Sequence, residues 1–361
     1  MAGTFRNLAV VPRMVFGRGA FGQLEEIVSK ARGGPGDAMI FLVDDVFKNH
    51  ALASRVPVGK SDHLVWVNVD VEPKTVYVDE LTQQARSLAG GDPAGVIGIG
   101  GGSVMDLAKA VALMLNNPGS SADYQGWDLI REPAAYHVGV PTLSGTGAEV
   151  SRTAVLSGPV RKLGLNSDYT VFDQIVLDPD LIADAPDPQR FYTGMDCYFH
   201  CVEAICGTFL NEFSRAYSEK ALELCRQVFL ETDVDRREAD EKLMMASYCG
   251  GMSIAYSQVG ACHALSYGLS FVLGLRHGEG NAVAFNQLEE FYPDGVREFR
   301  KMMEVQGLEL PAHVTRDLTD AQIDKMIEVS LSMGPLWENC LGPNWKNEMT
   351  PERARELYSR M

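Results

Sequence analysis

Short apolar runs that end in polar or glycine residues recur through the first half of this 361-residue chain, and they constrain its fold most strongly. Four such runs lie at 39–43, 65–69, 96–99 and 138–140, and stretches with helical periodicity separate them. This alternation is typical of βαβ units, whose strands pair in parallel in a buried sheet. We therefore predict an α/β domain that binds its ligands at the carboxyl edge of the sheet.

The pattern changes after about Pro186, where strand-like runs give way to helical periodicity. Residues 214–229 and 242–249 are the clearest examples. The sequence thus predicts two domains, an α/β domain over residues 1–185 and an all-helical domain over residues 186–361.

Four residues of the second half suit a divalent metal. Asp196 and His200 are four residues apart, so on a helix their side chains point the same way. His263 and His277 can join them only if the chain bends, because a straight helix would separate these two by roughly 21 Å. Glycines that could form the bend are Gly268, Gly274 and Gly278. One carboxylate oxygen and three imidazole nitrogens suit Zn²⁺ or Fe²⁺.

Two glycine-rich turns follow strand-like runs in the first half. The segment Gly100-Gly101-Gly102-Ser103 precedes a helical stretch, where glycines let the backbone approach a pyrophosphate at the helix N-terminus, and Ser103 could cap the helix. The turn 141–149 brings hydroxyl groups to the same edge of the sheet. We therefore predict a dinucleotide site in the first domain, a metal site in the second, and an active site in the cleft between them.

A third glycine pattern, Gly-Arg-Gly-Ala-Phe-Gly at 17–22, matches the GxGxxG fingerprint of dinucleotide-binding domains. Arg18 and Phe21 are bulky for such a loop and the helical stretch 24–31 is short, so we favour an ordinary turn here. Asp44, at the end of the run 39–43, could bind an adenosine ribose. It would favour NAD over NADP, because a carboxylate repels the 2′-phosphate.

The composition limits which binding partners and which cellular compartment we expect for this protein. The chain has 48 Asp and Glu against 32 Lys and Arg, a net charge of −16, so it should repel nucleic acid and anionic membranes. We find no apolar run of about 20 residues that could span a membrane and no secretory signal. Seven cysteines without a framework spacing fit reduced thiols in a cytoplasmic protein.

Together the motifs resemble those of the iron-containing (group III) alcohol dehydrogenase family. They are GGGSxxDxxK at 100–109, Thr-x-x-Gly-Thr-Gly at 142–147, Gly-Met-Asp-x-x-x-His at 194–200 and His-Gly at 277–278. The resemblance runs from about Phe16 to about Asn286. It implies a Rossmann-like N-terminal domain with a parallel sheet, an all-helical C-terminal domain as in dehydroquinate synthase-like proteins, a divalent metal (Fe²⁺ or Zn²⁺) and NAD.

The resemblance also implies roles for individual residues. The implied metal ligands are Asp196, His200, His263 and His277. The implied cofactor contacts are Gly100, Gly101, Gly102, Ser103, Asp106, Thr142, Ser144, Thr146, Lys162 and Leu181, to which we add Asp44 from its place at a strand end. Lys162 would lie near the nicotinamide ribose, and Leu181 belongs to the cofactor-contacting turn 178–181.

At one position the chain departs from the family pattern. The family usually has His-Ala-x-x-His at the third ligand, whereas this chain reads His263-Ala-Leu-Ser-Tyr267. We count Tyr267 among the catalytic residues, because a tyrosine can donate a hydrogen bond. It is a poor base at neutral pH, since the ordinary pKa of a tyrosine is about 10. Tyr267 therefore argues against the proton route that is usual in the family.

Within the family, the segments 124–130, 158–173 and 252–263 and Tyr267 are most similar to the subgroup of 3-deoxy-D-manno-octulosonate (Kdo) 8-oxidases of lipopolysaccharide biosynthesis. This implies oxidation of the primary alcohol at C8 of Kdo to an aldehyde by hydride transfer. Arg152 or Arg276 could bind the carboxylate of such a sugar acid, although an ordinary ion pair is the simpler interpretation of each.

Two alternatives stay open. One is a group III alcohol dehydrogenase that acts on another polyol or small alcohol. The other, of a different class, is a metal-dependent hydrolase without a nucleotide. For partners we expect a small-molecule substrate and a homodimer, with neither nucleic acid nor membrane.

Overall fold

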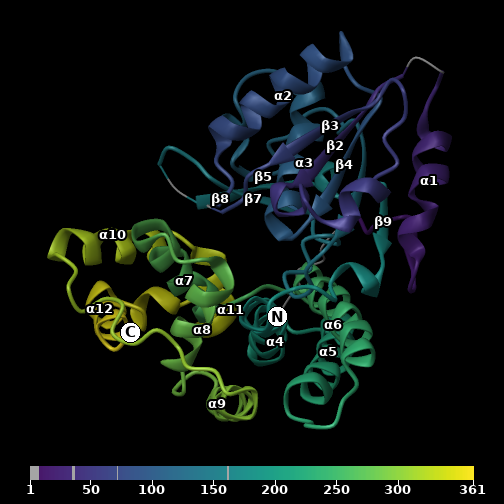
Figure 1. Cartoon of the computed structure of the whole chain (residues 1–361). Helices are drawn as coiled ribbons and strands as arrows, with labels where there is room; N and C mark the ends of the chain where they lie inside the picture. Colours follow the sequence, from purple (N-terminus) through teal and green to yellow (C-terminus); the bar gives the residue numbers. More distant parts are fainter. Residues whose placement is uncertain (1–7, 35–36, 71, 161) are drawn as a thin grey trace. The chain divides into compact units, whose positions relative to one another are not determined.

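The computed structural model describes residues 8–34, 37–70, 72–160 and 162–361, and the chain forms two compact units (Figure 1). The first, the α/β unit, comprises residues 1–143 and 148–184. The second, the helical unit, comprises residues 144–147 and 185–361. The turn 144–147 thus belongs to the helical unit, although the chain on both sides of it belongs to the α/β unit.

Six strands of the α/β unit form one sheet in which all pairs are parallel. In order across the sheet they are β1 (Met14–Phe16), β9 (Gln174–Leu177), β6 (Tyr136–Pro141), β4 (Gly95–Gly100), β2 (Met39–Asp44) and β3 (His63–Val67). Parallel pairing places Asp44, Gly100 and Thr142 at the same carboxyl edge, because β2, β4 and β6 are neighbours. This is the edge at which parallel sheets bind ligands.

Helices and a second, smaller sheet complete the α/β unit. The helices are α1 (Leu24–Ala31), α2 (Thr75–Ala89) and α3 (Gly102–Asn116), and the strands of the smaller sheet are β5 (Gly126–Trp127), β8 (Lys162–Asn166) and β7 (Thr153–Ser157). Both sheets and α2 contact α3, so this helix is buried on nearly all sides. Short 3₁₀ helices lie at Ala20–Gln23, Asp45–Phe47, Ala51–Arg55, Ser121–Tyr124, Asp168–Thr170 and Pro179–Leu181.

The helical unit contains the remaining helices. They are α4 (Asp187–Cys206), α5 (Glu212–Phe229), α6 (Arg236–Tyr256), α7 (Ala261–Leu273), α8 (His277–Asn286), α9 (Pro293–Gln306), α10 (Asp320–Leu331), α11 (Gly334–Leu341), η7 (Trp345–Asn347) and α12 (Pro351–Ser359). The unit has one large apolar core, with Phe199, Phe285 and Phe299 stacked edge to face and face to face within it. α4 runs through this core and is buried along most of its length, so polar side chains on it need partners inside the protein.

The predicted fold class, an α/β domain with a parallel sheet followed by an all-helical domain, is confirmed. The strand predicted at 65–69 was wrong by two residues. It is observed as His63–Val67, because pairing of His63 with Ile40 of β2 sets its register. The smaller sheet was missed, since its strands are short and one of them contains Gly164.

Two further expectations can be compared with the structure. Within the described residues, no helix combines the length and the apolar composition needed to cross a membrane. The seven cysteines are all free thiols, and five of them are buried.

Candidate metal centre and glycine-rich turns

One face of α4 carries the first two candidate ligands. Asp196 and His200 are one helical turn apart and almost fully buried, with exposed fractions of 1% and 4%. His200 Nε2 lies 3.6 Å from Asp196 Oδ1. The spacing of four residues therefore brings the two side chains together, as predicted.

A break between α7 and α8 brings the other two histidines back. α7 ends at Gly274, whose φ of +71° reverses the chain, and α8 begins at His277. Of the three glycines considered for this bend, Gly274 makes it. Gly268 lies inside α7 and Gly278 inside α8, and neither has a positive φ.

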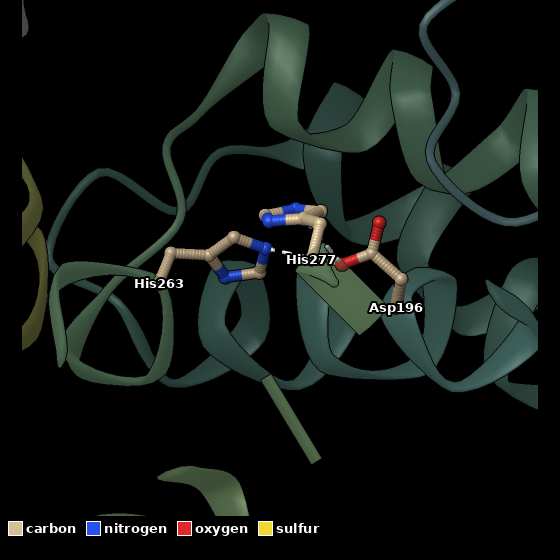
Figure 2. Close-up of side chains that lie close together, drawn as sticks. All are labelled: Asp196, His263 and His277. Atoms are coloured by element: carbon tan, nitrogen blue, oxygen red, sulfur yellow. Dashed lines mark hydrogen bonds and ion pairs between the residues drawn. The ribbon is translucent and has the colours of Figure 1, made fainter. Parts of the chain in front are cut away.

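The three histidine side chains surround one carboxylate oxygen of Asp196. Asp196 Oδ1 lies 3.3 Å from His263 Nε2 and 3.5 Å from His277 Nε2. Figure 2 shows these three side chains turned toward one another, and their potential ligand atoms all lie within 4.8 Å. The ring of His200 stacks on that of His263 with centroids 4.7 Å apart. Asp196, His263 and His277 thus form one compact group, and His200 Nε2 lies 3.6 Å from the same carboxylate oxygen.

The electrostatics of this cluster follow from burial and mutual contact. Burial alone would raise the pKa of Asp196, but the three histidines outweigh burial and hold it far below its ordinary value. Burial lowers the pKa of His200 to about 4. Burial also opposes the charged form of His263, yet the carboxylates of Glu203 and Asp196 outweigh it and raise this pKa to about 9.

Buried polar atoms of the cluster lack a hydrogen-bond partner among the described residues. They include Asp196 Oδ2 and His200 Nδ1. Burying a polar atom without a partner is costly, so such atoms mark places where a ligand or ion binds. The cluster could therefore hold a divalent cation.

Sequence reasoning missed two residues that contact the ligands. Asn281, four residues after His277 on α8, donates from Nδ2 to Asp196 Oδ1 at 2.6 Å and lies 3.2 Å from the Nε2 atoms of His263 and His277. Glu203, three residues after His200 on α4, contacts His263 at 2.5 Å. Their spacing from the candidate ligands His277 and His200 on the same helix faces was the signal that could have found them.

Tyr267 lies one turn after His263 on α7 and is half-buried. Its ring is 6.1 Å from that of His277, centroid to centroid. The ring of Tyr267 therefore lies beside one of the candidate ligands, and a tyrosine hydroxyl can act as a hydrogen-bond donor.

The first glycine-rich turn joins β4 to the N-terminus of α3. The N-cap of α3 is Gly101, which has no side chain to cap it, and Ser103 lies inside the helix. The expectation that Ser103 caps this helix was therefore wrong. A Cβ at Gly100 would lie 2.4 Å from Val104 Cγ2 and 3.2 Å from Asp44 Cβ, so this position requires glycine and lies close to Asp44.

Two charged side chains follow on α3. Asp106 is half-buried, and burial raises its pKa against the opposing effect of Lys109. Lys109 is fully buried, and its ammonium donates to the carbonyl oxygens of Ala148 (2.5 Å), Ser151 (2.7 Å) and Thr153 (3.1 Å). Lys109 therefore anchors the segment that follows the second glycine-rich turn.

The residues of the second turn are divided between the two units. Thr142 continues β6 and its N–H donates to the Gly100 carbonyl at 2.9 Å, which keeps it beside the first turn. Ser144 and Thr146 lie in the segment 144–147, where the Gly145 N–H donates to Ser247 Oγ on α6 at 2.8 Å. Ser144 and Thr146 thus belong to the unit that carries the candidate metal ligands.

The remaining cofactor candidates lie elsewhere in the α/β unit. Lys162 begins β8 and is buried, with its ammonium 2.5 Å from Glu72 Oε2. Leu181 is buried at the end of the 3₁₀ helix Pro179–Leu181.

The GxGxxG pattern at 17–22 forms a turn whose N–H groups bind a carboxylate of the protein itself. The carboxylate of Asp178 accepts hydrogen bonds from the N–H groups of Gly19 (3.1 Å) and Phe21 (3.0 Å). These are the donors that a phosphate would need. The turn interpretation therefore fits the structure better than the fingerprint.

Comparison with protein families gives two matches in chain order. Residues 12–179 match the model of iron-containing alcohol dehydrogenases, and residues 190–335 match the C-terminal model of the Fe-containing alcohol dehydrogenase family. Together the two models span most of the chain, including the glycine-rich turns and the four candidate ligands.

Among curated proteins, this chain is similar to alcohol dehydrogenases. Alcohol dehydrogenase 4 of Schizosaccharomyces pombe is 32% identical over 201 residues, which are 54% of this chain and only 47% of that protein. Long-chain-alcohol dehydrogenase 1 of Geobacillus thermodenitrificans is 30% identical over 271 residues, 73% of this chain and 68% of that protein. Among solved structures, a 1,3-propanediol oxidoreductase superimposes with a TM-score of 0.83 at 20% identity, covering 98% of this chain and 99% of that one.

Proposed function

Because this chain belongs to the iron-containing alcohol dehydrogenase family, we propose that it oxidises a primary alcohol to an aldehyde with a divalent metal and NAD. Membership makes it an oxidoreductase that acts on CH–OH groups. The observation that carries the proposal is that the Nε2 atoms of His200, His263 and His277 all lie within 3.6 Å of one carboxylate oxygen of Asp196.

The chemistry of the cluster fits a metal. One carboxylate and three imidazoles form a ligand set of borderline hardness that suits Fe²⁺ or Zn²⁺, and the unsatisfied Asp196 Oδ2 gives a second oxygen. When bound, the metal supplies a Lewis acid for a substrate hydroxyl, and NAD supplies the hydride acceptor. The residues Asp196, His200 and His263 on α4 and α7 are buried, whereas His277 at the start of α8 is partly exposed, so the cluster can be reached from one side.

The first glycine-rich turn fits the pyrophosphate of NAD. The N-terminus of α3 has no capping side chain, so its N–H groups can donate to an anion. Asp44 lies beside Gly100 at the same sheet edge, where its carboxylate can accept from an adenosine ribose hydroxyl. These two observations support Gly100, Gly101, Gly102, Ser103 and Asp44 as cofactor contacts.

The remaining proposed cofactor contacts are residues near the first turn and residues that the family pattern suggests. Thr142 lies next to the first turn, and Ser144 and Thr146 add hydroxyls after it. Asp106, the ion-paired Lys162 and the buried Leu181 complete the set that the family pattern suggests.

For the substrate we propose C8 of Kdo, as a step toward the 8-amino sugar of lipopolysaccharide. The support is the similarity of the segments 124–130, 158–173 and 252–263 to the Kdo 8-oxidases, together with Tyr267 in place of a histidine; residue 161 of the second segment lies outside the described residues. Arg276, exposed and next to His277, is the better candidate for the sugar carboxylate. Arg152 is already bound by Asp128 (2.5 Å) and Asp168 (3.0 Å).

Incubation of the purified protein with Fe²⁺ or Zn²⁺, NAD and either Kdo or 1,3-propanediol tests the proposal. We expect aldehyde from Kdo, captured with a hydrazine reagent so that reoxidation of NADH does not hide it, and little from the diol. A chelator should abolish the product. Aldehyde from the diol alone would leave the alcohol dehydrogenase assignment and overturn Kdo. No aldehyde from either alcohol, with no binding or reduction of NAD, would favour the hydrolase alternative.

Tyr267→His should raise turnover of 1,3-propanediol by at least about tenfold, since a positioned acid–base group contributes about 10²–10⁴-fold. The new imidazole would lie one turn after His263 and near His277. Steady-state kinetics on the diol measure the effect, and Tyr267→Phe, which removes only the hydroxyl, is the control. Equal rates for the histidine and phenylalanine variants would show that this position does not set the substrate class.

Metal affinity should rise with pH, by about tenfold per unit between about pH 6 and pH 8, because one proton is released on binding. The pKa of His263 is about 9, so this side chain must lose a proton before Nε2 can bind a metal. His200, with a pKa of about 4, is already neutral in this range. Competition with a chelator at several pH values measures the slope, and a flat profile would contradict the proton release.

A further inference from the structure

A third polar residue shares the face of α4 that carries Asp196 and His200. Glu203 follows Asp196 by seven residues and His200 by three, which on a helix is the same side. Its side chain is 1% exposed. A carboxylate so deep in an apolar core must be satisfied by the protein.

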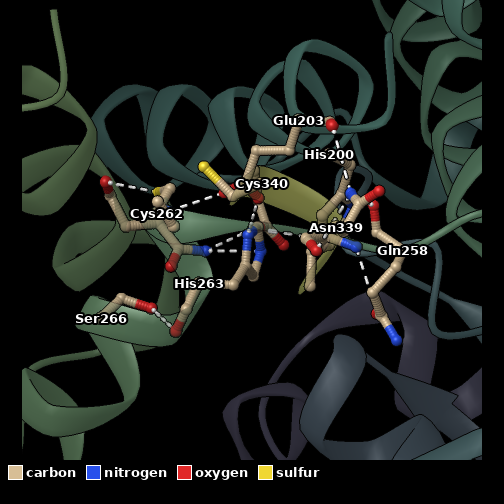
Figure 3. A network of polar contacts seen from close by, with 12 residues as sticks. His200, Glu203, Gln258, Cys262, His263, Ser266, Asn339 and Cys340 are labelled. Atoms are coloured by element: carbon tan, nitrogen blue, oxygen red, sulfur yellow. Dashed lines mark hydrogen bonds and ion pairs between the residues drawn. The ribbon is translucent and has the colours of Figure 1, made fainter. Parts of the chain in front are cut away.

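The contacts of Glu203 meet that need and point at one ligand. Oε2 lies 2.5 Å from His263 Nδ1, while Oε1 accepts from the Cys262 N–H at 2.7 Å and from the Tyr292 hydroxyl at 3.4 Å. Figure 3 shows Glu203, Cys262 and His263 within one network of buried polar contacts. Glu203 therefore touches His263 on the side opposite to Asp196, which faces Nε2.

The short distance decides what kind of contact this is. Glu203, Cys262 and His263 could by position hold an ion of their own. Two ligands of one tetrahedral metal at about 2.0–2.1 Å would be roughly 3.3 Å apart, whereas the Glu203 oxygen and His263 Nδ1 are 2.5 Å apart. The Cys262 thiol also donates elsewhere, to the Asn281 carbonyl at 3.3 Å. The contact between Glu203 and His263 therefore fits a hydrogen bond and does not fit two ligands of one metal.

The side chain of Asn339 links the backbone next to Glu203 with the backbone next to His263. Asn339 Nδ2 donates to the Gln258 carbonyl at 2.7 Å, just before α7, and Asn339 Oδ1 accepts from the Phe209 N–H at 3.0 Å, just after α4. Figure 3 shows Asn339 and Gln258 joined in this way. Asn339 thus ties the end of α4 to the start of α7.

We propose that Glu203 is a positioning residue that keeps the proton of His263 on Nδ1 and so leaves Nε2 to bind the metal. The inference rests on the metal site of the proposed function and adds to it the residue that fixes one ligand. A carboxylate can do this because it only accepts: it takes the Nδ1–H on one oxygen and the Cys262 N–H on the other.

Glu203→Gln tests the proposal with almost no change in shape. The amide has one oxygen and one NH₂, so it cannot accept from both partners. If its oxygen faces the Cys262 N–H, its NH₂ faces Nδ1 and forces the imidazole proton to Nε2. If its oxygen faces His263, two donors oppose each other at Cys262.

We expect the Zn²⁺ affinity of the full-length Glu203→Gln variant to fall by about 10–100-fold, as for other outer-shell partners of metal ligands. The midpoint temperature of thermal unfolding of the metal-free variant should stay close to that of the metal-free wild type. Glu298→Gln is the matched control, because Glu298 is a carboxylate of the same unit that accepts from Tyr198 and Arg226 and from none of the four ligands. That control should bind Zn²⁺ as the wild type does.

NMR spectroscopy distinguishes a role of Glu203 in fixing the His263 proton from a purely structural role in the fold. In the Zn²⁺-loaded protein, ¹⁵N-edited NMR of the histidines should show one Nδ1–H shifted far downfield, and Glu203→Gln should lose that signal. A Glu203→Gln variant that is folded and binds Zn²⁺ with wild-type affinity would overturn the inference. Absence of the downfield Nδ1–H signal in the Zn²⁺-loaded wild type would overturn it as well. A wild type that binds no Zn²⁺ or Fe²⁺ would instead refute the proposed metal site itself.

Discussion

Gly145→Ala should destabilise the helical unit by at least about 3 kcal/mol, the upper end of the usual range for overpacking. A Cβ here would lie 1.6 Å from the carbonyl oxygen of Thr193, a backbone atom of α4 that no side-chain rotation can move. The turn would have to leave α4 and lose the hydrogen bond from Gly145 to Ser247. Urea denaturation followed by circular dichroism measures the free energy of unfolding. NAD affinity should fall as well, because Ser144 and Thr146 lie in the same turn.

Gly274→Ala is the matched control for this variant. Both glycines have a positive φ, +159° for Gly145 and +71° for Gly274, but a Cβ at Gly274 would meet nothing within 4 Å. We therefore expect only the strain of a left-handed alanine there, about 1–2 kcal/mol. Equal losses for the two variants would mean that the contact with α4 is not what requires glycine at position 145.

His277→Ala should lose metal and activity together, with metal affinity reduced by more than about 100-fold, the upper end of what the loss of an outer-shell partner costs. Its side chain is 28% exposed at the first position of α8, so its removal should leave the fold intact. NAD affinity should change little, because Gly100 to Ser103 lie in the α/β unit. Metal content after dialysis and a fluorescence titration with NAD measure the two effects.

His313→Asn serves as the control for the histidine variant. His313 is an exposed histidine of the same unit with φ of +56°, a conformation that asparagine tolerates. It should keep full metal and activity. If His277→Ala did so too, His277 would have to be removed from the ligand set.

The parts of the site that were predictable from the sequence are those set by local spacing. The i, i+4 pair of Asp196 and His200 needs only a helix to meet, and the strands β2, β4 and β6 follow from runs of apolar residues. The return of His277 to His263 could be stated only as a condition, because three glycines could have made the bend. The left-handed backbone at Gly274 meets that condition.

The parts that were not predictable depend on contacts between distant segments. The role of Glu203 needs α7 to place His263 and Cys262 beside it, 60 residues away in the case of His263. Ser103 looked like a helix cap, but the helix begins at Gly102, so the serine lies inside it. Arg152 looked available for a carboxylate until the fold placed Asp128 and Asp168 against it.

X-ray absorption at the metal edge of the loaded protein tests the central claim, that Asp196, His200, His263 and His277 bind one divalent metal. We expect a shell of nitrogen and oxygen atoms at about 2.0–2.2 Å, with the outer scattering of imidazole rings and no sulfur. A sulfur neighbour at about 2.3 Å would place the metal instead at the second group of Glu203, Cys262 and His263, and would contradict the account.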